Sequence, residues 1–240
     1  MPAYNEAEGI GELILEIERE VVVRHARTEV IVVDDASTDG TAAVLERLAR
    51  DRPWLRVERA AQNAGHGPSV VRGLELAGGE WIFQLDSDRQ FVVAELARLW
   101  EVRDRADLVL GVRVERRDPG HRIVLSLAVR LVASALAGRK LRDPNVPFRL
   151  LRGKLWSELR PLVGPDTLAP SILIAVGAAV TGRRIVEVPI THLPRLHGAS
   201  SLRRWRLVVF SLRGLRQLAA YRLALARIGT HEARHPREAP

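Results

Sequence analysis

Short apolar runs alternate with longer amphipathic stretches over the first half of the chain. The apolar runs, which have the length of buried strands, cover residues 28–34, 55–59, 80–85 and 107–112. The stretches with helical spacing of apolar residues cover residues 8–25, 40–50, 67–77 and 92–104. Strands that alternate with helices in this way predict an α/β fold whose sheet is mostly parallel, with helices on both faces.

The second half is dominated by two long apolar stretches. Residues 123–137 are apolar apart from Arg130 and two serines, and residues 167–182 carry no charged side chain. Both are shorter than the roughly 20 residues that a helix needs to cross a bilayer, and Pro170 interrupts the second. We therefore expect two core helices, although a helix over residues 121–138 is also suited to lying against a membrane.

A basic amphipathic helix is predicted at residues 202–228. At 100° per residue, four of its arginines fall within an arc of about 80°: Arg206, Arg213, Arg216 and Arg227. The opposite side carries Leu207, Leu212, Leu215, Leu218, Tyr221 and Leu225. Such a helix fits the lipid headgroup layer, but it equally fits packing on the domain through its apolar face. The chain thus divides into a domain at residues 1–200, the helix within 201–228 and a polar tail at 229–240 that we expect to be disordered.

Composition and the first residues constrain the size of the core, the kinds of site that are possible and the location of the protein. The chain has 240 residues, of which 47% are hydrophobic, enough for one substantial core. Cysteine is absent, which excludes disulfides and thiolate metal sites and is compatible with a reducing cytoplasm. The first residues do not read as a secretory signal, so we expect the protein to stay on the side of the membrane where it is made.

The net charge of +8 comes almost entirely from arginine, since Lys140 and Lys154 are the only lysines. Such a charge attracts nucleic acid, anionic lipid or phosphorylated substrates. It is also typical of proteins encoded by GC-rich genes, so charge alone does not choose a partner.

An acidic turn closes one of the predicted strands. Asp86-Ser87-Asp88 follows the apolar run at 81–85, and ligands of open α/β sheets bind beyond the carboxyl ends of strands. Two carboxylates at this position can hold a hard divalent cation and leave positions for phosphate oxygens, which suggests nucleotide-diphosphate chemistry. Taken alone, such a pair is also typical of a solvated turn or a helix N-cap.

A second acidic turn follows the strand at 28–34. Asp39 or Thr38 can cap the helix behind it, but capping needs one such side chain and this turn carries three acids. The remaining pair, Asp34 and Asp35, is suited to accepting hydrogen bonds from a base edge or from ribose hydroxyls.

Taken in order, these motifs resemble family 2 glycosyltransferases. The shared early motifs are Pro2-Ala3-Tyr4-Asn5-Glu6, the turn at residues 32–41, Asn63-Ala64-Gly65 with Gly73, and Asp86-Ser87-Asp88. The later ones are Gly111-Val112-Arg113, Asp143 with Phe148-Arg149, and Glu187-Val188-Pro189 leading to Arg195-Leu196-His197-Gly198-Ala199-Ser200. The later set is similar to dolichol-phosphate mannose synthases and their bacterial polyprenyl-phosphate relatives. The resemblance covers residues 1 to about 212 and implies a Rossmann-like GT-A fold.

On the donor side, the resemblance implies a nucleotide pocket and a site for Mg²⁺ or Mn²⁺. The implied nucleotide-binding residues are Pro2, Ala3, Tyr4, Glu6, Asp34 and Asp35, with Asp35 the better candidate of the acidic pair. The implied metal ligands are Asp86, Asp88 and Gln90, with Asp88 the direct ligand. Simple packing also explains Tyr4, and the helix dipole also explains Glu6. We expect Arg89 to contact the diphosphate or solvent.

On the acceptor side, the resemblance implies arginines that position a polyprenyl phosphate. This phosphate is already an anionic nucleophile, so it needs placement rather than deprotonation, and guanidinium forks suit that task. The implied acceptor residues are Arg113, Arg122, Arg149, Arg195 and Ser200, and the implied catalytic residues are Asp88, Arg113, Arg149 and Arg195. Surface solubility alone would explain any single arginine in so basic a chain.

The chain departs from the family pattern at two places. It has Ser201 where the family often has lysine, which puts the phosphate contact of that lysine in doubt. Asn145-Val146-Pro147 replaces the glycine-containing lead to Phe-Arg, a change in the acceptor loop.

We therefore expect a metal-dependent inverting glycosyltransferase that acts at the cytoplasmic face of the cell membrane as a peripheral protein bound to anionic lipid. It would move a hexose from a GDP- or UDP-hexose to a dolichyl or undecaprenyl phosphate.

The first alternative is a relative that glycosylates a hydroxyl group and needs a general base. Asp166 lies near the position where such relatives carry that base, although a helix N-cap also explains this residue. The second alternative, a nucleic-acid-binding protein, is disfavoured because two Tyr and four Phe provide no aromatic platform. We therefore expect no nucleic-acid partner.

The resemblance also bears on the start of the chain. In the family an apolar strand runs directly into the Pro-x-Tyr-Asn-Glu motif, and here Met1 takes the place of its final residue. A missing central strand leaves backbone groups of its neighbours unpaired, at about 1 to 3 kcal/mol for each buried group. We therefore expect that the natural protein starts upstream of Met1, and that the chain as given is unstable or has a rearranged sheet edge.

Overall fold

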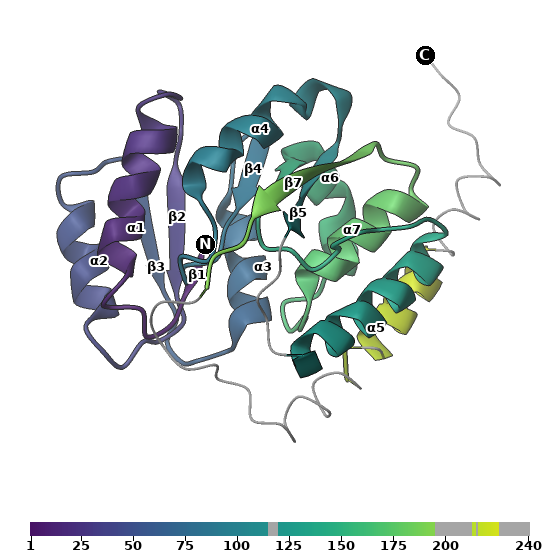
Figure 1. Ribbon diagram of the computed structural model, residues 1–240. Coiled ribbons are helices and arrows are strands. Elements are labelled where there is room, and N and C mark those ends of the chain that lie inside the picture. The colour runs from purple at the N-terminus through teal and green to yellow at the C-terminus, as the bar shows by residue number, and fades with distance from the viewer. Residues whose placement is uncertain (115–119, 195–212, 215, 226–240) are drawn as a thin grey trace, which may run out of the picture.

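The strands form two sheets whose edges face each other across the middle of the molecule (Figure 1). The computed structural model describes residues 1–114, 120–194, 213–214 and 216–225. Within these residues, one sheet has the strand order β1-β2-β3 and the other has the order β4-β6-β5-β7. The strands are β1 (Pro2–Ala3), β2 (Val30–Asp34), β3 (Leu55–Arg59), β4 (Trp81–Gln84), β5 (Leu108–Val114), β6 (Arg149–Arg152) and β7 (Ile185–Thr191).

The prediction of a mostly parallel sheet is wrong for the second of these sheets. β1, β2 and β3 are parallel, and so are β5 and β7, but β6 runs antiparallel to both β4 and β5. β6 was not predicted, because it is only four residues long and has arginine at both ends. Its insertion between two strands that run in the same direction makes the sheet mixed, while the fold class remains α/β.

Helices cover the sheets on both sides. They are α1 (Ile10–Ile17), α2 (Thr41–Ala49), α3 (His66–Leu76), α4 (Leu96–Glu101), α5 (Gly120–Ala137), α6 (Gly153–Leu159) and α7 (Pro170–Val180). Two predicted helices are shorter than expected. The stretch at 8–25 continues from α1 into a π-helical turn at Glu18–Val22, and α4 is flanked by 3₁₀ turns at Val93–Glu95 and Arg103–Arg105.

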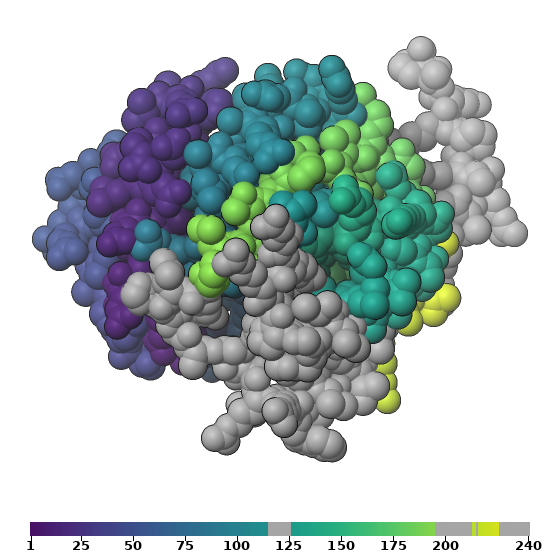
Figure 2. Space-filling view, in the orientation of Figure 1, coloured from purple at the N-terminus to yellow at the C-terminus, as the bar shows by residue number. Residues whose placement is uncertain are grey.

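The predicted core helix at 167–182 is confirmed by α7. All its residues from Pro170 to Ala178 are buried, and it contacts α3, α5 and α6. α5 lies outside α7 and exposes Leu127 and Leu131. The space-filling view shows β7 as a band between α4 and α5 (Figure 2). In the described part of the chain, no helix combines the length and the apolar character that crossing a membrane requires.

Part of the predicted C-terminal helix is described. Residues 216–225 are helical, and Leu218, Tyr221 and Leu225 are buried in the core while Arg216 is exposed. Arg222 Nε donates to the Leu136 carbonyl oxygen at 3.1 Å, which ties this segment to the end of α5. The apolar side of the segment therefore packs on the domain. Residues 201–212 and the tail at 229–240 lie outside the described residues.

The first strand has only two residues, Pro2 and Ala3. Its two residues pair with Val33 and Asp34 of β2. The ladder ends at Met1, whose amine donates to the Ile31 carbonyl oxygen at 2.9 Å and whose carbonyl oxygen accepts from Val33 N at 2.9 Å. Beyond that point, toward the start of β2, the two sheets are separate.

Candidate active site

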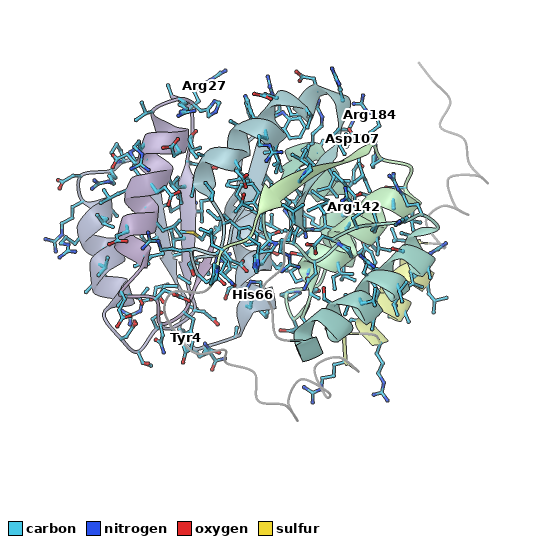
Figure 3. All side chains as sticks on the ribbon, viewed as in Figure 1. Tyr4, Arg27, His66, Asp107, Arg142 and Arg184 are labelled. Atoms are coloured by element: carbon cyan, nitrogen blue, oxygen red, sulfur yellow. The ribbon has the colours of Figure 1, made fainter. Side chains whose placement is uncertain are left out.

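Three turns gather at the carboxyl ends of β1, β2 and β4. They are the predicted nucleotide and metal motifs, at residues 4–7, 35–40 and 85–90. Figure 3 shows Tyr4 at the lower edge of the molecule, His66 in the lower half of the view, and Arg27, near the start of β2, at the upper edge. The strands thus deliver these motifs to the edge where open α/β sheets bind ligands.

Each of the three turns contains a residue in the left-handed backbone region. These residues are Asn5 (φ 55°), Ala36 (φ 56°) and Arg89 (φ 56°), and they are the non-glycine residues with positive φ in the described part of the chain. Such conformations are unfavourable for residues with a side chain and cluster at functional sites. Their distribution marks this edge as the functional one.

The first two turns are joined by hydrogen bonds. Asn5 N donates to Ser37 Oγ at 3.0 Å, and Asn5 Oδ1 accepts from Thr38 N at 2.8 Å. Glu6 is buried, and its backbone N–H donates to Thr41 Oγ1 at 2.8 Å. Tyr4, between these anchored residues and β1, stays 41% exposed and is available to a ligand.

Asp39 closes the second turn. Its carboxylate accepts from Thr41 N at 2.9 Å and from Ala7 N at 3.2 Å. Burial opposes ionisation, but the hydrogen bonds from Thr41 and Ala7 lower the pKa of Asp39 below its ordinary value. Asp39 supports the turn through these bonds, but it is not the predicted helix cap, because the N-cap residue of α2 is Gly40 and makes no side-chain cap bond. The pair at the strand tip remains for other roles.

Asp34 is fully buried within that pair. Its Oδ1 accepts from Ser37 N at 3.0 Å, and its Oδ2 lies 3.6 Å from Arg59 Nε. The Asp34 side chain therefore lies buried under the turn at residues 35–40 and is hydrogen-bonded to it.

Asp35 holds the loop that carries the third motif of the resemblance. Its two carboxylate oxygens accept from Ala64 N at 2.9 Å and from Gly65 N at 2.8 Å, and its carbonyl oxygen accepts from the Asn63 amide at 3.1 Å. A carboxylate offers about four acceptor positions, so these two bonds leave acceptor capacity for a base or a ribose. Asp35 therefore shapes the loop at 63–65, and its binding of a nucleotide stays a prediction.

His66 connects this loop to the predicted metal motif. It is the first residue of α3, and its Nε2 lies 3.0 Å from Asp86 Oδ1. The negative charge of Asp86 raises the pKa of His66, although desolvation opposes it. Burial would raise the pKa of Asp86, but His66 lowers it, so that Asp86 is held ionised.

His66 was missed in the sequence, because one exposed histidine next to a glycine follows no recognisable pattern. The signal that points to it is its position, directly after Asn63-Ala64-Gly65.

The residues predicted to bind a metal offer oxygen ligands at the end of β4. Asp88 Oδ1 accepts from Gln90 N at 3.2 Å, and the Gln90 side-chain amide donates to the Leu193 carbonyl oxygen at 3.2 Å. No group of three or more acidic, histidine or cysteine side chains converges as a metal cage anywhere in the described residues. Carboxylates that leave positions open suit Mg²⁺ or Mn²⁺, which bind proteins through one or two carboxylates together with substrate phosphates. The residues present fit such a cation.

Arg89 turns toward α1 in this structure. Its guanidinium forms an ion pair with Glu12, and its side chain packs against Gly9. Arg89 is therefore held against α1, and its contact with the diphosphate stays a prediction.

On the acceptor side, Arg113 is held by an acidic partner. Its Nε and Nη2 donate to the two carboxylate oxygens of Asp143 at 2.7 and 2.8 Å, and both side chains are largely buried. A fork of this kind fixes the guanidinium plane near the end of β5. The structure thereby brings together two residues of the later motifs.

Arg149 occupies a different environment from the one expected of a phosphate ligand. Its side chain is fully buried, and it donates four hydrogen bonds to the carbonyl oxygens of Pro144, Val146 and Ser171. Burial lowers its pKa, and the charges of Asp143 and Asp86 oppose this. Arg149 ties β6 to the preceding loop and to α7, and its binding of an acceptor phosphate stays a prediction.

The structure describes the remaining predicted residues only in part. Arg122 lies in α5, and its side chain is outside what the structure describes, as are the whole of Arg195 and Ser200. The cap interpretation of Asp166 is wrong, because α7 begins at Pro170 with Ala169 as its N-cap residue. The Asp166 carbonyl oxygen instead accepts from the Gln217 side chain at 3.1 Å.

Two curated proteins are similar to this chain in sequence. An undecaprenyl-phosphate 4-deoxy-4-formamido-L-arabinose transferase of Edwardsiella ictaluri is 27% identical over 87% of this chain and 63% of its own length. A dodecaprenyl-phosphate galacturonate synthase of Rhizobium johnstonii is 26% identical over 83% of this chain and 60% of its own length. The chain thus spans about three-fifths of the length of these curated relatives.

Two solved structures share the GT-A-like fold. A mannosyltransferase from Pyrobaculum calidifontis, in complex with GDP-Man and Mn²⁺, superposes with a TM-score of 0.64 at 24% identity, over 93% of this chain and 62% of that one. Glucosyl-3-phosphoglycerate synthase from Mycobacterium tuberculosis, in complex with Mn²⁺, UDP-glucose and phosphoglyceric acid, gives 0.65 at 20% identity, over 92% and 77%. The family model for glycosyl transferase family 2 matches residues 1–169. Together with the three motif-bearing turns at one edge of the sheets, this match shows that the chain belongs to that family.

Proposed function

We propose that this glycosyltransferase moves a sugar from a nucleotide diphosphate sugar to a polyprenyl phosphate, with Mg²⁺ or Mn²⁺ at the end of β4. The observation that carries the proposal is the connection of the second turn to the third: Asp35 holds the loop at 63–65, and His66 links that loop to Asp86. A nucleoside bound by the first two turns would place its diphosphate beside the third. The relatives whose names specify polyprenyl phosphates support the acceptor class.

The donor end of the proposed site is divided between two sets of residues. Tyr4 and the turn at 35–40 would bind the nucleoside, with Asp35 accepting hydrogen bonds from the base or the ribose. Asp88, with Asp86 and Gln90, would hold the metal. The cation, when bound, neutralises charge on the departing nucleoside diphosphate.

The reaction needs a positioned nucleophile. A phosphate oxygen of the acceptor would form a bond to the anomeric carbon as the bond from that carbon to the diphosphate breaks, with inversion of configuration. No proton has to be removed from an acceptor that is already ionised, so the task of the protein is placement. Arg113, fixed by Asp143, is the described arginine best placed for it, and Arg122, Arg149, Arg195 and Ser200 are the further candidates.

We also propose that the protein works at the cytoplasmic face of the cell membrane as a peripheral protein. α5 exposes Leu127 and Leu131, and the described part of the C-terminal helix exposes Arg213, Arg216 and Leu223. Apolar side chains next to arginines match the two requirements of binding to an anionic bilayer surface. Reversal of charge at Arg213 and Arg216 is expected to weaken co-sedimentation with anionic vesicles, and unchanged co-sedimentation would remove this helix from the proposal.

The test is a transfer assay with purified protein. GDP- and UDP-linked sugars are each incubated with a short-chain polyprenyl phosphate and Mg²⁺ or Mn²⁺, and the lipid product is identified by mass. The donor panel includes a pentose, a hexose and a hexuronic acid, because the relatives named above act on a formamido-arabinose and on galacturonate. We expect transfer of one sugar to the phosphate, a hexose being our first expectation. Transfer to a hydroxyl acceptor but never to the phosphate would contradict the proposal and favour a glycosyltransferase of the other acceptor class.

A further inference from the structure

The third of the three turns is fastened to the helix that follows the first one. The Arg89 guanidinium forms an ion pair with Glu12, which belongs to the beginning of α1. The first turn is bonded to the second through Asn5, and the second is connected to the third through Asp35 and His66. The ion pair therefore closes a ring of contacts that joins all three turns.

The backbone of Arg89 bears on the predicted metal ligands at either side of it. Arg89 lies between Asp88 and Gln90, and its φ of 56° is in the left-handed region. A residue with a Cβ keeps this conformation only where the surrounding structure holds it there. Gln90 N donates to Asp88 Oδ1 at 3.2 Å across Arg89, so the conformation of Arg89 determines how the Asp88 carboxylate is directed.

The side chain of Arg89 is held by two features of α1. Glu12 pairs with its guanidinium, and Gly9 leaves room for its aliphatic part. A Cβ on Gly9 would lie 3.3 Å from Arg89 Cδ, which is closer than ordinary van der Waals contact. Farther along α1, Glu16 accepts from Val93 N at 3.2 Å. α1 thus supports the segment after the metal motif at two points.

This ion pair is suited to a local role. The Arg89 side chain is 26% exposed and that of Glu12 is 67% exposed. Ion pairs that are open to solvent add little to the stability of a whole fold. The effect of the pair is therefore expected on the turn that it fixes rather than on global unfolding.

We propose that Arg89 is a positioning residue, whose ion pair with Glu12 holds the left-handed turn that directs Asp88 toward the cation. This inference rests on the proposed function, in which Asp88 holds Mg²⁺ or Mn²⁺. Arg89 then acts through its backbone and not through contact with the diphosphate. Gly9 and Glu12 support the metal site from a helix that carries none of the predicted ligands.

The first test needs no metal. With a chelator present, hydrogen exchange of the Gln90 amide reports how well its bond to Asp88 is held. We expect Glu12→Ala to speed this exchange at least about threefold and to leave exchange in β5 unchanged. Glu158→Ala is the matched control, because it breaks another ion pair between separate elements, with Arg183. Both variants should melt within about 2 °C of the parent.

The second test separates positioning from contact with the diphosphate. UDP and GDP are titrated into Glu12→Ala, Arg89→Gly and the double variant, once with chelator and once with Mn²⁺. Glycine adopts the left-handed conformation readily but gives Glu12 no guanidinium to hold. Each single variant should weaken binding with Mn²⁺ at least about threefold and leave binding with chelator within about 1.5-fold of the parent. The double variant should bind no more weakly than Arg89→Gly, because Glu12 acts only through Arg89.

Three results would overturn the inference. Weaker binding of UDP or GDP to Arg89→Gly with chelator present would assign the guanidinium to the diphosphate. Additive losses in the double variant would show that Glu12 acts through its charge alone. Unchanged exchange of the Gln90 amide in Glu12→Ala would show that the ion pair does not hold the turn. Nucleotide binding of the parent that ignores Mn²⁺ would count against the metal site of the proposed function, and Gln90 exchange would then decide the role of the ion pair by itself.

Discussion

His66 Nε2 lies 3.0 Å from Asp86 Oδ1 and thereby joins the start of α3 to the turn that follows β4. The loop on the other side of His66 is held by Asp35, through Ala64 and Gly65. One short segment therefore connects the predicted nucleotide pocket to the predicted metal ligands.

The first prediction is that the contribution of this pair to stability depends on pH. Asp86 raises the pKa of His66 in the folded protein above the ordinary value of 6.5. The stabilisation is thus fully present below pH 6.5 and is lost as the pH rises through the folded pKa. His66→Asn should cost up to about 0.5 kcal/mol at pH 6 and almost nothing at pH 9, a small effect because the histidine is largely exposed.

Urea unfolding of both proteins in the presence of a chelator measures this difference. The chelator keeps divalent cations from competing for Asp86. A cost of His66→Asn that is the same at pH 6 and pH 9 would show that the contact is not an ion pair.

The second prediction concerns Asp88. Asp88→Ala should lower transfer at least about 100-fold and leave the melting temperature within about 2 °C of the parent, because the residue follows a strand end and does not belong to the core. Asp51→Ala is the matched control, since Asp51 is an exposed acid in the turn after α2. Near-parental turnover of the Asp88 variant at saturating Mn²⁺ would remove this residue from the metal site.

The third prediction is that Asp35 has a structural and a binding effect at once. Asp35→Ala leaves the Ala64 and Gly65 N–H groups without their acceptor, at a cost of about 1 to 3 kcal/mol in unfolding free energy. It should also weaken binding of UDP or GDP, because the loop and the acceptor are lost together. Denaturant unfolding and calorimetric titration measure the two effects separately, and unchanged nucleotide affinity would reduce Asp35 to a turn residue.

The sequence predicted the positions of the acidic turns, because the signals for these turns are local. Each acidic motif directly follows an apolar run, and β3 was predicted with the boundaries that it has in the structure. Contacts between turns could not be predicted from these local patterns. The bond of Asn5 to Thr38 joins residues far apart in sequence, and His66 gains its role only through the placement of Asp86.

The second sheet and the surroundings of the later motifs were predicted less well, because their signals are not local. β6 carries too few residues to show a periodic pattern, and only the assembled sheet reveals that it runs antiparallel between β4 and β5. An arginine within a motif also gives no sign of what its guanidinium contacts. Arg113 meets a carboxylate, whereas Arg149 meets backbone carbonyl groups.

The last prediction separates these two arginines. Arg149→Met should destabilise the protein by about 3 to 5 kcal/mol, because it removes the donor for the carbonyl groups of Pro144, Val146 and Ser171 and leaves the nearby buried Asp143 with less positive charge around it. Arg149→Lys should recover only part of this loss, since an ammonium group cannot reproduce the planar fork that reaches three carbonyls. Arg160→Met, at an exposed position after α6, controls for loss of charge.

Denaturant unfolding of the three variants gives the free energies, and acceptor titration of whatever protein remains folded gives KM for the polyprenyl phosphate. A residue that only ties β6 to α7 changes stability and leaves the acceptor KM of the folded fraction near that of the parent. A normally stable Arg149→Met protein with a KM raised tenfold or more, that is by about 1.4 kcal/mol of binding, would instead assign the guanidinium to the acceptor phosphate. The buried position and the four carbonyl contacts of Arg149 favour the first result.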